Sequence, residues 1–434
     1  MMERIETVIV GGGQAGLATS YFLKQQGHEH VVLEQAAQAA PVWRNERWDS
    51  FTLVTPNWAT RMPGAAYDGP DPDGFMPRDE VIAYFARYVD RFQLPVQVNT
   101  RVRSVDLADG DGYRVTTPER TFAAKNVVMA TGFFQQPKIS PFAASLSPGV
   151  RQLHSSQYRN PESLPTGAVL VVGSAQSGCQ IAEELYQRGR NVFLSTGTAG
   201  RVPRRYRGKD VIAWLVETGF IDLTPAQLPP GMSKFEGIPH ISGTRGGHTI
   251  NLHQFARDGV TLLGHLRGAA GDMISLASDL HENLAKVDQF ERDVLNMFDG
   301  YIEKKGLDAP AEEVPQLRDG FNQPIIEELN LRGSGISTVI WAMGYTFDYS
   351  LMKLPVRDDD GFPIQSSGVT NVPGLYFVGL PWMPSERSGF LLGVGESAEH
   401  IASCIEGQAR GRRSGGMPTE SMSGTAASVG AGPH

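Results

Sequence analysis

The apolar positions of the chain form short runs separated by amphipathic stretches, which is the pattern of alternating strands and helices. One such unit opens the chain: an apolar run at 5–10, a glycine-rich turn, a helical stretch closed by Gly27, and a second apolar run at 31–33. The same succession returns with apolar runs at 168–172 and 192–194, beginning about 160 residues later. The pattern predicts an α/β protein with two nested Rossmann-like dinucleotide-binding folds.

The rest of the chain predicts a further set of elements. The longest is a helix over 279–305, where Asp279 and Glu282 have capping-box spacing and Gly306 ends the periodicity. Residues 41–77 lack periodicity and are rich in Pro, Gly and Trp, which is typical of a functional loop. Other strands are predicted over 96–105, 125–130, 338–342 and 375–379, and other helices over 78–92 and 393–405.

The first glycine turn (11–16) has the spacing G-x-G-x-x-G between an apolar strand and a helix. Gly11 permits a tight turn, Gly13 lets the backbone approach a pyrophosphate, and Gly16 lets the helix pack closely on the strand. The free N–H groups and the dipole at the helix N-terminus favour phosphate. Glu34 ends the second strand, where a carboxylate can accept hydrogen bonds from a ribose diol. We expect a dinucleotide bound by Gly11, Gly13, Gln14, Ala15, Gly16 and Glu34.

The second glycine turn (173–178) has Ala175 in place of the middle glycine, between Gly173 and Gly178. Its second strand ends at Ser195 without an acid, and several arginines follow. A missing carboxylate removes repulsion of a 2′-phosphate, and guanidinium groups bind phosphate, so the pattern favours NADPH over NADH. A solvated basic loop is the alternative, and the spacing does not tell which arginine contacts the phosphate. The residues expected to bind this nucleotide are Gly173, Ala175, Ser177, Gly178, Ser195, Arg204 and Arg205.

The amino-acid composition excludes several classes of function for this chain. Lys and Arg number 39 against 47 Asp and Glu, a net charge of −8 that disfavours general nucleic-acid binding. No apolar run reaches the ~18 residues of a membrane span. The two cysteines, Cys179 and Cys404, lie far apart, which argues against a dithiol or disulfide framework and favours a reducing cytoplasm. The histidines show no metal-ligand spacing.

Two nucleotide folds in one chain imply a nicotinamide donor and a resident flavin, and the order along the chain assigns FAD to the first fold. Further motifs lie at 43–50, at Ala130-Thr131-Gly132 and at 341–345. With these motifs and the two glycine turns, residues 5–405 resemble the class B flavin-dependent monooxygenases, which include the flavin-containing and plant indole-pyruvate monooxygenases.

The chain departs from that family at two places. Ser147 stands where the family segment between the two folds has phenylalanine, and the following His154 lies one residue further from Gly149 than in the family. The alternative to a proton-transfer role for His154 is that it ties the two folds together. Leu380 follows Gly379 where many flavoproteins have an aspartate for the ribityl chain, so that contact must come from elsewhere, such as the backbone near Leu380.

The resemblance implies that FAD and NADPH serve an O2-dependent reaction on a small-molecule substrate. In the family, a flavin C4a-(hydro)peroxide is shielded by bound NADP+ and passes oxygen to a soft nitrogen or sulfur atom or to a carbonyl compound. The sequence does not distinguish these outcomes. The resemblance implies no metal, no nucleic acid and no membrane as a partner, and it is compatible with a homodimer. The residues expected at the flavin are Trp43, Arg44, Trp48, Ala130, Thr131, Gly132, Leu380 and Gly393.

Asn57 is the predicted catalytic residue, because related monooxygenases often place an asparagine near the flavin and the nicotinamide. Its amide can orient oxygen or the nucleotide. The alternative is an asparagine that supports the turn after Pro56. Ordinary core packing is the corresponding alternative for the tryptophans. Backbone N–H groups near Gly393, at a helix start, can stabilise negative charge on the flavin.

We expect a discontinuous FAD domain of residues 1–165 and 346–406, an inserted NADPH domain of residues 166–345, and a disordered tail of residues 407–434. Two other functions remain open: a reductase that passes electrons to another acceptor, and a flavin-binding sensor without turnover. The absence of C-x-x-C disfavours a dithiol acceptor, and the basic loop of the second fold disfavours a sensor, since a sensor needs no reductant.

Overall fold

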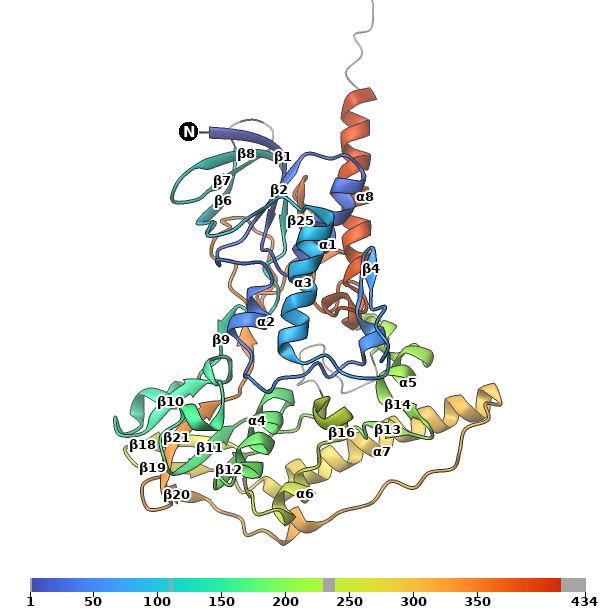
Figure 1. Cartoon of the computed structure of the whole chain (residues 1–434). Helices are drawn as coiled ribbons and strands as arrows, with labels where there is room; N and C mark the ends of the chain where they lie inside the picture. The colour runs from blue at the N-terminus through green and yellow to red at the C-terminus, as the bar shows by residue number, and fades with distance from the viewer. Residues whose placement is uncertain (1, 109, 111, 229–238, 415–434) are drawn as a thin grey trace, which may run out of the picture.

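The computed structural model of the protein describes residues 2–108, 110, 112–228 and 239–414. Figure 1 shows two α/β lobes, which we call the first lobe (upper) and the second lobe (lower). Both ends of the described chain, β1 and α8, belong to the first lobe, so the second lobe is inserted within it. Each lobe is built on a sheet with a parallel centre, which confirms the predicted α/β fold class.

The first lobe is built on a nine-stranded sheet whose centre is parallel. Val8 and Ile9 at its middle are fully buried, as expected for a strand with helices or sheet on both faces. The strand order is β23-β24-β25-β8-β1-β2-β5, with β6 and β7 attached through β8. Their bounds are β1 (Met2–Val10), β2 (His30–Leu33), β5 (Val96–Gln97), β6 (Ser104–Leu107), β7 (Tyr113–Thr116), β8 (Thr121–Met129), β23 (Gln365–Ser366), β24 (Val369–Thr370) and β25 (Leu375–Phe377).

Helices α1 and α8 pack against each other beside this sheet (Figure 1). Leu17 and Ala18 of α1 and Ile401 and Ala402 of α8 are fully buried in one apolar cluster. On α3, Val81, Phe85 and Tyr88 share one face, which is buried in the same cluster. The helices of this lobe are α1 (Gln14–Gln25), α2 (Pro41–Asn45), α3 (Arg78–Phe92) and α8 (Val394–Ser414).

The second lobe is built on a five-stranded, all-parallel sheet in the order β10-β21-β11-β12-β17. A three-stranded antiparallel sheet, β18-β19-β20, belongs to the same lobe. The strands are β10 (Arg151–His154), β11 (Ala168–Val172), β12 (Val192–Ser195), β17 (Thr261–Leu263), β18 (Leu266–Ala270), β19 (Met273–Leu276), β20 (Glu328–Asn330) and β21 (Ile336–Trp341). The helices are α4 (Gln176–Gln187), α5 (Val211–Glu217), α6 (Leu252–Arg257) and α7 (Leu280–Lys305).

Short two-stranded pairs complete the structure. One of them, β9 with β22, pairs the segment that leaves the first lobe with the segment that returns to it. The paired strands are β3 (Arg61–Met62) with β4 (Ala65–Ala66), β9 (Gln136–Pro137) with β22 (Tyr345–Thr346), β13 (Arg205–Tyr206) with β14 (Lys209–Asp210), and β15 (Ile241–Ser242) with β16 (His248–Thr249).

Three sequence expectations need correction. The predicted strand 96–105 is broken into β5 and β6, because Asn99 adopts a φ of 53° that interrupts the extended backbone. The second sheet includes β10, so its first strand begins before the expected boundary at 165/166. Helix α8 continues to Ser414, past the expected start of the tail at 407, and residues 415–434 lie outside the described residues.

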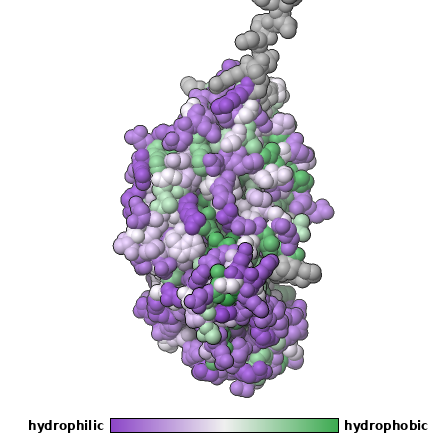
Figure 2. Space-filling model, turned by 90° about the vertical axis from the view of Figure 1, so that its right-hand side faces the viewer, coloured by the Kyte–Doolittle hydropathy of each residue, from purple (hydrophilic) through white to green (hydrophobic). Residues whose placement is uncertain are grey.

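Two observations bear on the surface. Figure 2 shows a mainly hydrophilic face, on which hydrophobic side chains gather around the junction of the two lobes. Among the described residues, no helix combines the length and the apolar character needed to cross a bilayer.

Candidate functional site

The two glycine turns have the same backbone construction at their first glycine. Gly11 and Gly173 have φ values of 110° and 106°, which side-chain-bearing residues rarely adopt. A Cβ on either glycine would lie 2.5 Å from a carbonyl oxygen, that of Ala130 after β8 or that of Ala342 after β21. Each turn therefore sits where the first strand of its unit meets the end of the neighbouring parallel strand.

The last glycine of each turn, Gly16 or Gly178, lies in the first turn of its helix, α1 or α4. A Cβ on Gly16 would lie 2.0 Å from the Gly11 oxygen, and one on Gly178 would lie 1.9 Å from the Gly173 oxygen. The close helix–strand packing expected of these positions is therefore present in both units. At the middle position, a Cβ on Gly13 would meet nothing within 4 Å, which leaves the N-terminus of α1 open for a phosphate group.

Both turns open into one cavity of about 1890 Å³ that spans the two lobes. Typical pockets for one small molecule have volumes of roughly 300–1,000 Å³, so this cavity has room for more than one ligand. Its lining includes most of the residues predicted to bind nucleotides: Gly11, Gly13, Gln14, Ala15, Glu34, Trp43, Ala130, Thr131, Gly132, Gly173, Ala175, Ser177 and Ser195.

Glu34 is held at the first turn by two backbone groups. Its carboxylate accepts hydrogen bonds from the N–H of Gly12 and of Ala36, both at 2.8 Å, and its side chain lines the cavity although the residue is 4 % exposed. Burial raises the pKa of Glu34, and the backbone hydrogen bonds oppose that rise. The geometry places a carboxylate where a ribose diol binds in dinucleotide folds.

The corresponding position of the second unit carries hydroxyl groups. Ser195 donates to the carbonyl of Gly264 at 2.9 Å and Thr196 donates to that of Leu263 at 2.8 Å. Both hydroxyls are thus engaged in joining the ends of β12 and β17. No carboxylate follows β12 directly, as the sequence indicated.

The structure corrects the prediction for the two arginines expected to bind the 2′-phosphate, because neither Arg204 nor Arg205 faces the cavity. Arg204 is 2 % exposed, binds Asp210 through Nε (2.9 Å) and Nη2 (2.5 Å), and donates to the carbonyl of Val54 at 2.6 Å. Arg205 is exposed on β13, and neither side chain lines the cavity. If this guanidinium turned to a ligand, the buried carboxylate of Asp210 would lose its partner, and an unpaired buried charge is strongly destabilising.

The predicted catalytic residue, Asn57, is buried in the loop after Pro56, and its Oδ1 has no hydrogen-bond partner among the described residues. It is 5 % exposed in a short 3-10 helix (Asn57–Ala59) and does not line the cavity, although Thr55 does. Its amide nitrogen donates to the carbonyl of Asp71 at 2.9 Å. The contact supports the turn-forming alternative, in which Asn57 holds the loop of residues 55–74 together.

Four other predicted flavin residues lie outside the cavity lining. Trp48 is 4 % exposed and packs edge-on against Phe51, with ring centroids 5.2 Å apart, which corresponds to the core-packing alternative. Leu380 is likewise a core residue, while its neighbours Gly379 and Pro381 line the cavity. The remaining two that do not line the cavity are Arg44 and Gly393.

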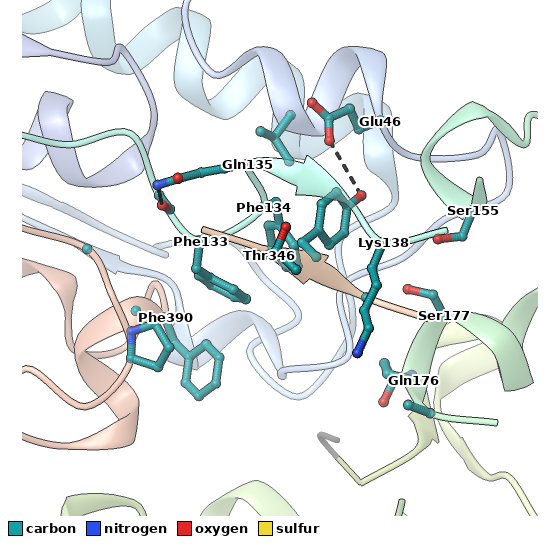
Figure 3. A pocket seen from close by; sticks show the side chains of 18 of the residues that line it. Glu46, Phe133, Phe134, Gln135, Lys138, Ser155, Gln176, Ser177, Thr346 and Phe390 are labelled. Atoms are coloured by element: carbon teal, nitrogen blue, oxygen red, sulfur yellow. Dashed lines mark hydrogen bonds between the residues drawn. The ribbon is translucent and has the colours of Figure 1, made fainter. Parts of the chain in front are cut away.

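The sequence did not reveal a polar cluster at the crossing between the lobes (Figure 3). The hydroxyl of Tyr345 lies 3.5 Å from the Glu46 carboxylate, and the Arg47 guanidinium lies 4.8 Å from the centre of the Phe134 ring. Burial raises the pKa of Glu46. Glu46 and Arg47 come from the motif at 43–50 and Tyr345 from the motif at 341–345, so the motifs were visible in the sequence but the contact between them was not.

His154 joins the same crossing. Its Nε2 donates to the carbonyl of Gly344 at 3.1 Å, its Nδ1 accepts from the backbone N–H of Ser156 at 3.2 Å, and its ring packs edge-on against Tyr345. Burial lowers the pKa of His154. The contacts favour the alternative in which His154 ties the two folds together.

Lys138 is a second group that sequence reasoning missed. It follows β9, and its backbone N–H donates to the carbonyl of Gly344 at 2.9 Å. Figure 3 shows its side chain extending across the cavity toward Gln176 and Ser177, at the N-terminus of α4. Its ammonium group has no hydrogen bond or ion pair within the described chain. A cation facing the positive end of a helix dipole favours an anion between the two.

Another part of the cavity lining is apolar. It is formed by side chains of α5, α7 and the segment 381–391, and Glu386 is the acid among the described lining residues of these elements. Burial alone raises the pKa of Glu386. Gln14 ties this segment to the first glycine turn by donating to the carbonyl of Gly389 at 2.7 Å. The apolar lining residues of α5, η5 (Phe220–Asp222), α7 and the last segment are Val211, Ile212, Leu215, Phe220, Ile221, Phe290, Val294, Pro381, Trp382, Phe390 and Leu391.

Comparison with known proteins agrees with this construction. Residues 8–217, which contain both glycine turns, match the pyridine nucleotide-disulphide oxidoreductase family. The chain is 34 % identical over 408 residues to an uncharacterised CzcO-like oxidoreductase of Geobacillus kaustophilus, covering 93 % of this chain and 99 % of that protein. The chain belongs to the CzcO-like oxidoreductase family. Because nearly the whole of both proteins is aligned, the family includes both lobes.

Solved structures define the fold of this CzcO-like oxidoreductase. A flavin-containing monooxygenase from Stenotrophomonas maltophilia has 20 % identity and a TM-score of 0.64, covering 94 % of this chain and 100 % of that chain. The structure of OTEMO in complex with FAD and NADP has 15 % identity and a TM-score of 0.57, covering 94 % of this chain and 86 % of that chain. The CzcO-like chain thus has the fold of class B flavin-dependent monooxygenases, as its motifs predicted.

Proposed function

We propose that this CzcO-like protein is an FAD- and NADPH-dependent monooxygenase acting on a small molecule. One observation carries the proposal: two glycine turns of the same construction open into a single cavity that spans both lobes. Two dinucleotides bound at these turns extend toward each other within one enclosed space. That arrangement suits hydride transfer between them better than it suits two independent binding events.

The first turn is the proposed FAD site. Gly11, Gly13 and the open N-terminus of α1 face the pyrophosphate position, and Glu34 supplies an acceptor for the ribose diol. The cavity-lining segment Ala130–Gly132 follows β8 beside this turn. Bound FAD supplies the redox chemistry that reduces O2. The chain's own contribution is to hold the flavin between the segment 381–391 and the junction of the lobes.

The second turn is the proposed NADPH site. Ala175 and the N-terminus of α4 face the pyrophosphate position, and Lys138 extends toward the same place from the segment that links the lobes. Because Lys138 is held by Gly344 on the returning segment, pyrophosphate binding would engage both connections between the lobes. The dinucleotide would then help to close the cavity against water, which preserves reactive oxygen species for the substrate.

The apolar part of the cavity is the proposed substrate site. Its aliphatic and aromatic lining favours a lipophilic small molecule, and the oxygen acceptor is a soft nitrogen, a sulfur or a carbonyl compound. Among the described residues that line this part of the cavity, Glu386 is the acid, and burial favours its neutral form. A protonated Glu386 can donate a hydrogen bond to an oxygen of the substrate or product.

Rapid mixing distinguishes this proposal from its rivals. Purified protein is reduced anaerobically with NADPH, mixed with O2, and followed by absorbance. A long-lived species that differs from both oxidised and reduced flavin supports the monooxygenase. Immediate return of oxidised flavin would favour a reductase with another acceptor, and failure of NADPH to bleach the flavin would favour a flavin-binding sensor. A screen of amines, sulfides and ketones for faster decay of the species identifies the substrate class.

A further inference from the structure

The carboxyl ends of β12 and β17 form the edge of the second lobe where the adenosine ribose of a dinucleotide binds in this class of fold. The two strands are parallel neighbours, with Ser195 paired to Leu263, so the segments that follow them lie side by side. Both segments, 196–200 and 264–266, are represented in the cavity lining. Among the described residues that line this edge, His265 is the only basic side chain.

The imidazole of His265 is held in one orientation. Its Nδ1 lies 2.7 Å from Oδ2 of Asp279, and its backbone N–H donates to Oδ1 of the same carboxylate at 2.9 Å. Its Nε2 faces the loop after β12, since a Cβ built on Gly197 would lie 3.7 Å from that nitrogen. With Nδ1 donating to Asp279, Nε2 is the ring nitrogen left to bind a ligand.

The side chain of Asp279 hydrogen-bonds to His265 and does not cap helix α7, which it precedes. The sequence predicted a capping box of Asp279 and Glu282, but the Asp279 side chain makes no capping hydrogen bond to α7. Burial acts to raise the pKa of the Asp279 carboxyl, and the hydrogen bonds from His265 outweigh it and hold that pKa below its usual range. Giving up an N-cap costs about 1 kcal/mol of helix stability. The carboxylate instead accepts hydrogen bonds from His265 and, at 3.3 Å, from the side-chain amide of Asn283.

We propose that His265, oriented by Asp279, binds the 2′-phosphate of NADPH through Nε2 and thereby sets the preference for NADPH over NADH. The proposal rests on the proposed use of a nicotinamide dinucleotide at the second turn. His265 would then have the role that the sequence predicted for Arg204, whose guanidinium forms an ion pair with Asp210. An imidazolium is the donor in a charge-assisted bond to phosphate, and its loss of a proton removes that charge.

The preference for NADPH must therefore weaken as the pH rises. The charged groups around the imidazole are Asp279, which precedes α7, and, 3.9 Å from that carboxylate, the guanidinium of Arg267 from β18. Arg267 is largely exposed and does not line the cavity. The Arg267→Gln variant is thus a matched control, because it removes a positive charge beside the same carboxylate without touching the ligand position.

Calorimetric titration of the FAD-loaded protein with adenosine 2′,5′-bisphosphate and with AMP measures the 2′-phosphate contribution without turnover. The measured quantity is the affinity for adenosine 2′,5′-bisphosphate divided by the affinity for AMP. Between pH 6.5 and 9, we expect this affinity ratio of the wild-type protein to fall by about ten- to one hundred-fold, which is the range of one charge-assisted hydrogen bond. His265→Asn, which keeps an amide for Asp279, should show the low ratio at every pH. His265→Arg should show a high ratio that no longer depends on pH, and Arg267→Gln should follow the wild type.

A ratio that is independent of pH in the wild type overturns the proposal, as does a wild-type ratio in folded His265→Asn. Unchanged melting temperatures of the variants establish that they fold, and the wild-type pH profile tests the proposal even if one variant does not. Failure of the proposed function has a different signature, because then neither NADPH nor NADH bleaches the flavin at any pH. Bleaching by both nucleotides with no role for His265 refutes this inference alone.

Discussion

The Gly178→Ala substitution separates the roles of the two glycine turns. The added Cβ would lie 1.9 Å from the Gly173 oxygen, whereas ordinary contacts begin at 3.4 Å, so α4 and the turn must separate by about 1.5 Å. Overpacking of this kind costs about 1–3 kcal/mol of stability. A displacement of about 1 Å at a reacting centre costs about 100-fold in rate, so we expect NADPH to bleach the flavin at least about 100-fold more slowly.

The assay uses absorbance to measure FAD content after gel filtration, then anaerobic stopped-flow reduction by NADPH. Gly178→Ala should retain FAD, because the first turn lies in the other lobe. Gly16→Ala, which places a Cβ 2.0 Å from the Gly11 oxygen, should instead lose FAD. Gly300→Ala is the control, since an exposed glycine of α7 with nothing within 4 Å gains about 1 kcal/mol of helix stability. Wild-type reduction rates in Gly178→Ala, or loss of FAD from it, would refute the assignment of the turns.

Three further predictions follow from individual side chains. Lys138→Gln should raise the Kd of NADPH and of NADH alike, by about tenfold or more, because the pyrophosphate is common to both. Lys353→Gln, at an exposed lysine, serves as the control. An effect on the Kd of NADPH alone would contradict the assignment of Lys138 to the pyrophosphate. Glu34→Ala should weaken FAD retention by at least about tenfold in filtration assays, and full retention by the variant would remove Glu34 from the ribose site. Glu386 has a folded-state pKa raised by burial, so its stabilising contribution is complete at low pH and declines as the pH rises above the ordinary value of 4.5. Melting curves of Glu386→Gln should therefore match the wild type at low pH and exceed it increasingly toward neutrality; a constant difference would show that the raised pKa is not the cause.

The duplicated units were predictable because their signals are local. The motif glycines of the first turn lie within six residues, and Gly11 and Gly16 each have a steric reason that depends on their own strand and helix. Apolar periodicity likewise located β11, α3 and α7, whose buried faces repeat at strand or helix spacing. The resemblance to class B monooxygenases rested on the same short motifs, and the family and the fold confirm it.

Side-chain partners distant in sequence could not be predicted in this way. Arg204 looked like a phosphate ligand because arginines cluster in its segment, but its partners are Asp210 and the carbonyl of Val54, which lies 150 residues away. Asn57 has a partner only 14 residues away, yet the contact depends on how the loop folds back. In both cases the residue type suggested a role at the site, whereas the structure pairs the Arg204 guanidinium with Asp210 and the Asn57 amide nitrogen with the carbonyl of Asp71.

The sequence by itself determined the two Rossmann-like folds, the position of their glycine turns and the acid at the end of the first unit. Only the tertiary structure decided which charged groups face the cavity, because that depends on strand pairing and on the crossing between lobes. Lys138 reaches α4 through the pairing of β9 with β22, and His265 reaches the end of β12 because β17 lies beside it. Backbone preferences act over a few residues, whereas the electrostatic environment of a side chain is the sum of neighbours brought together from the whole chain.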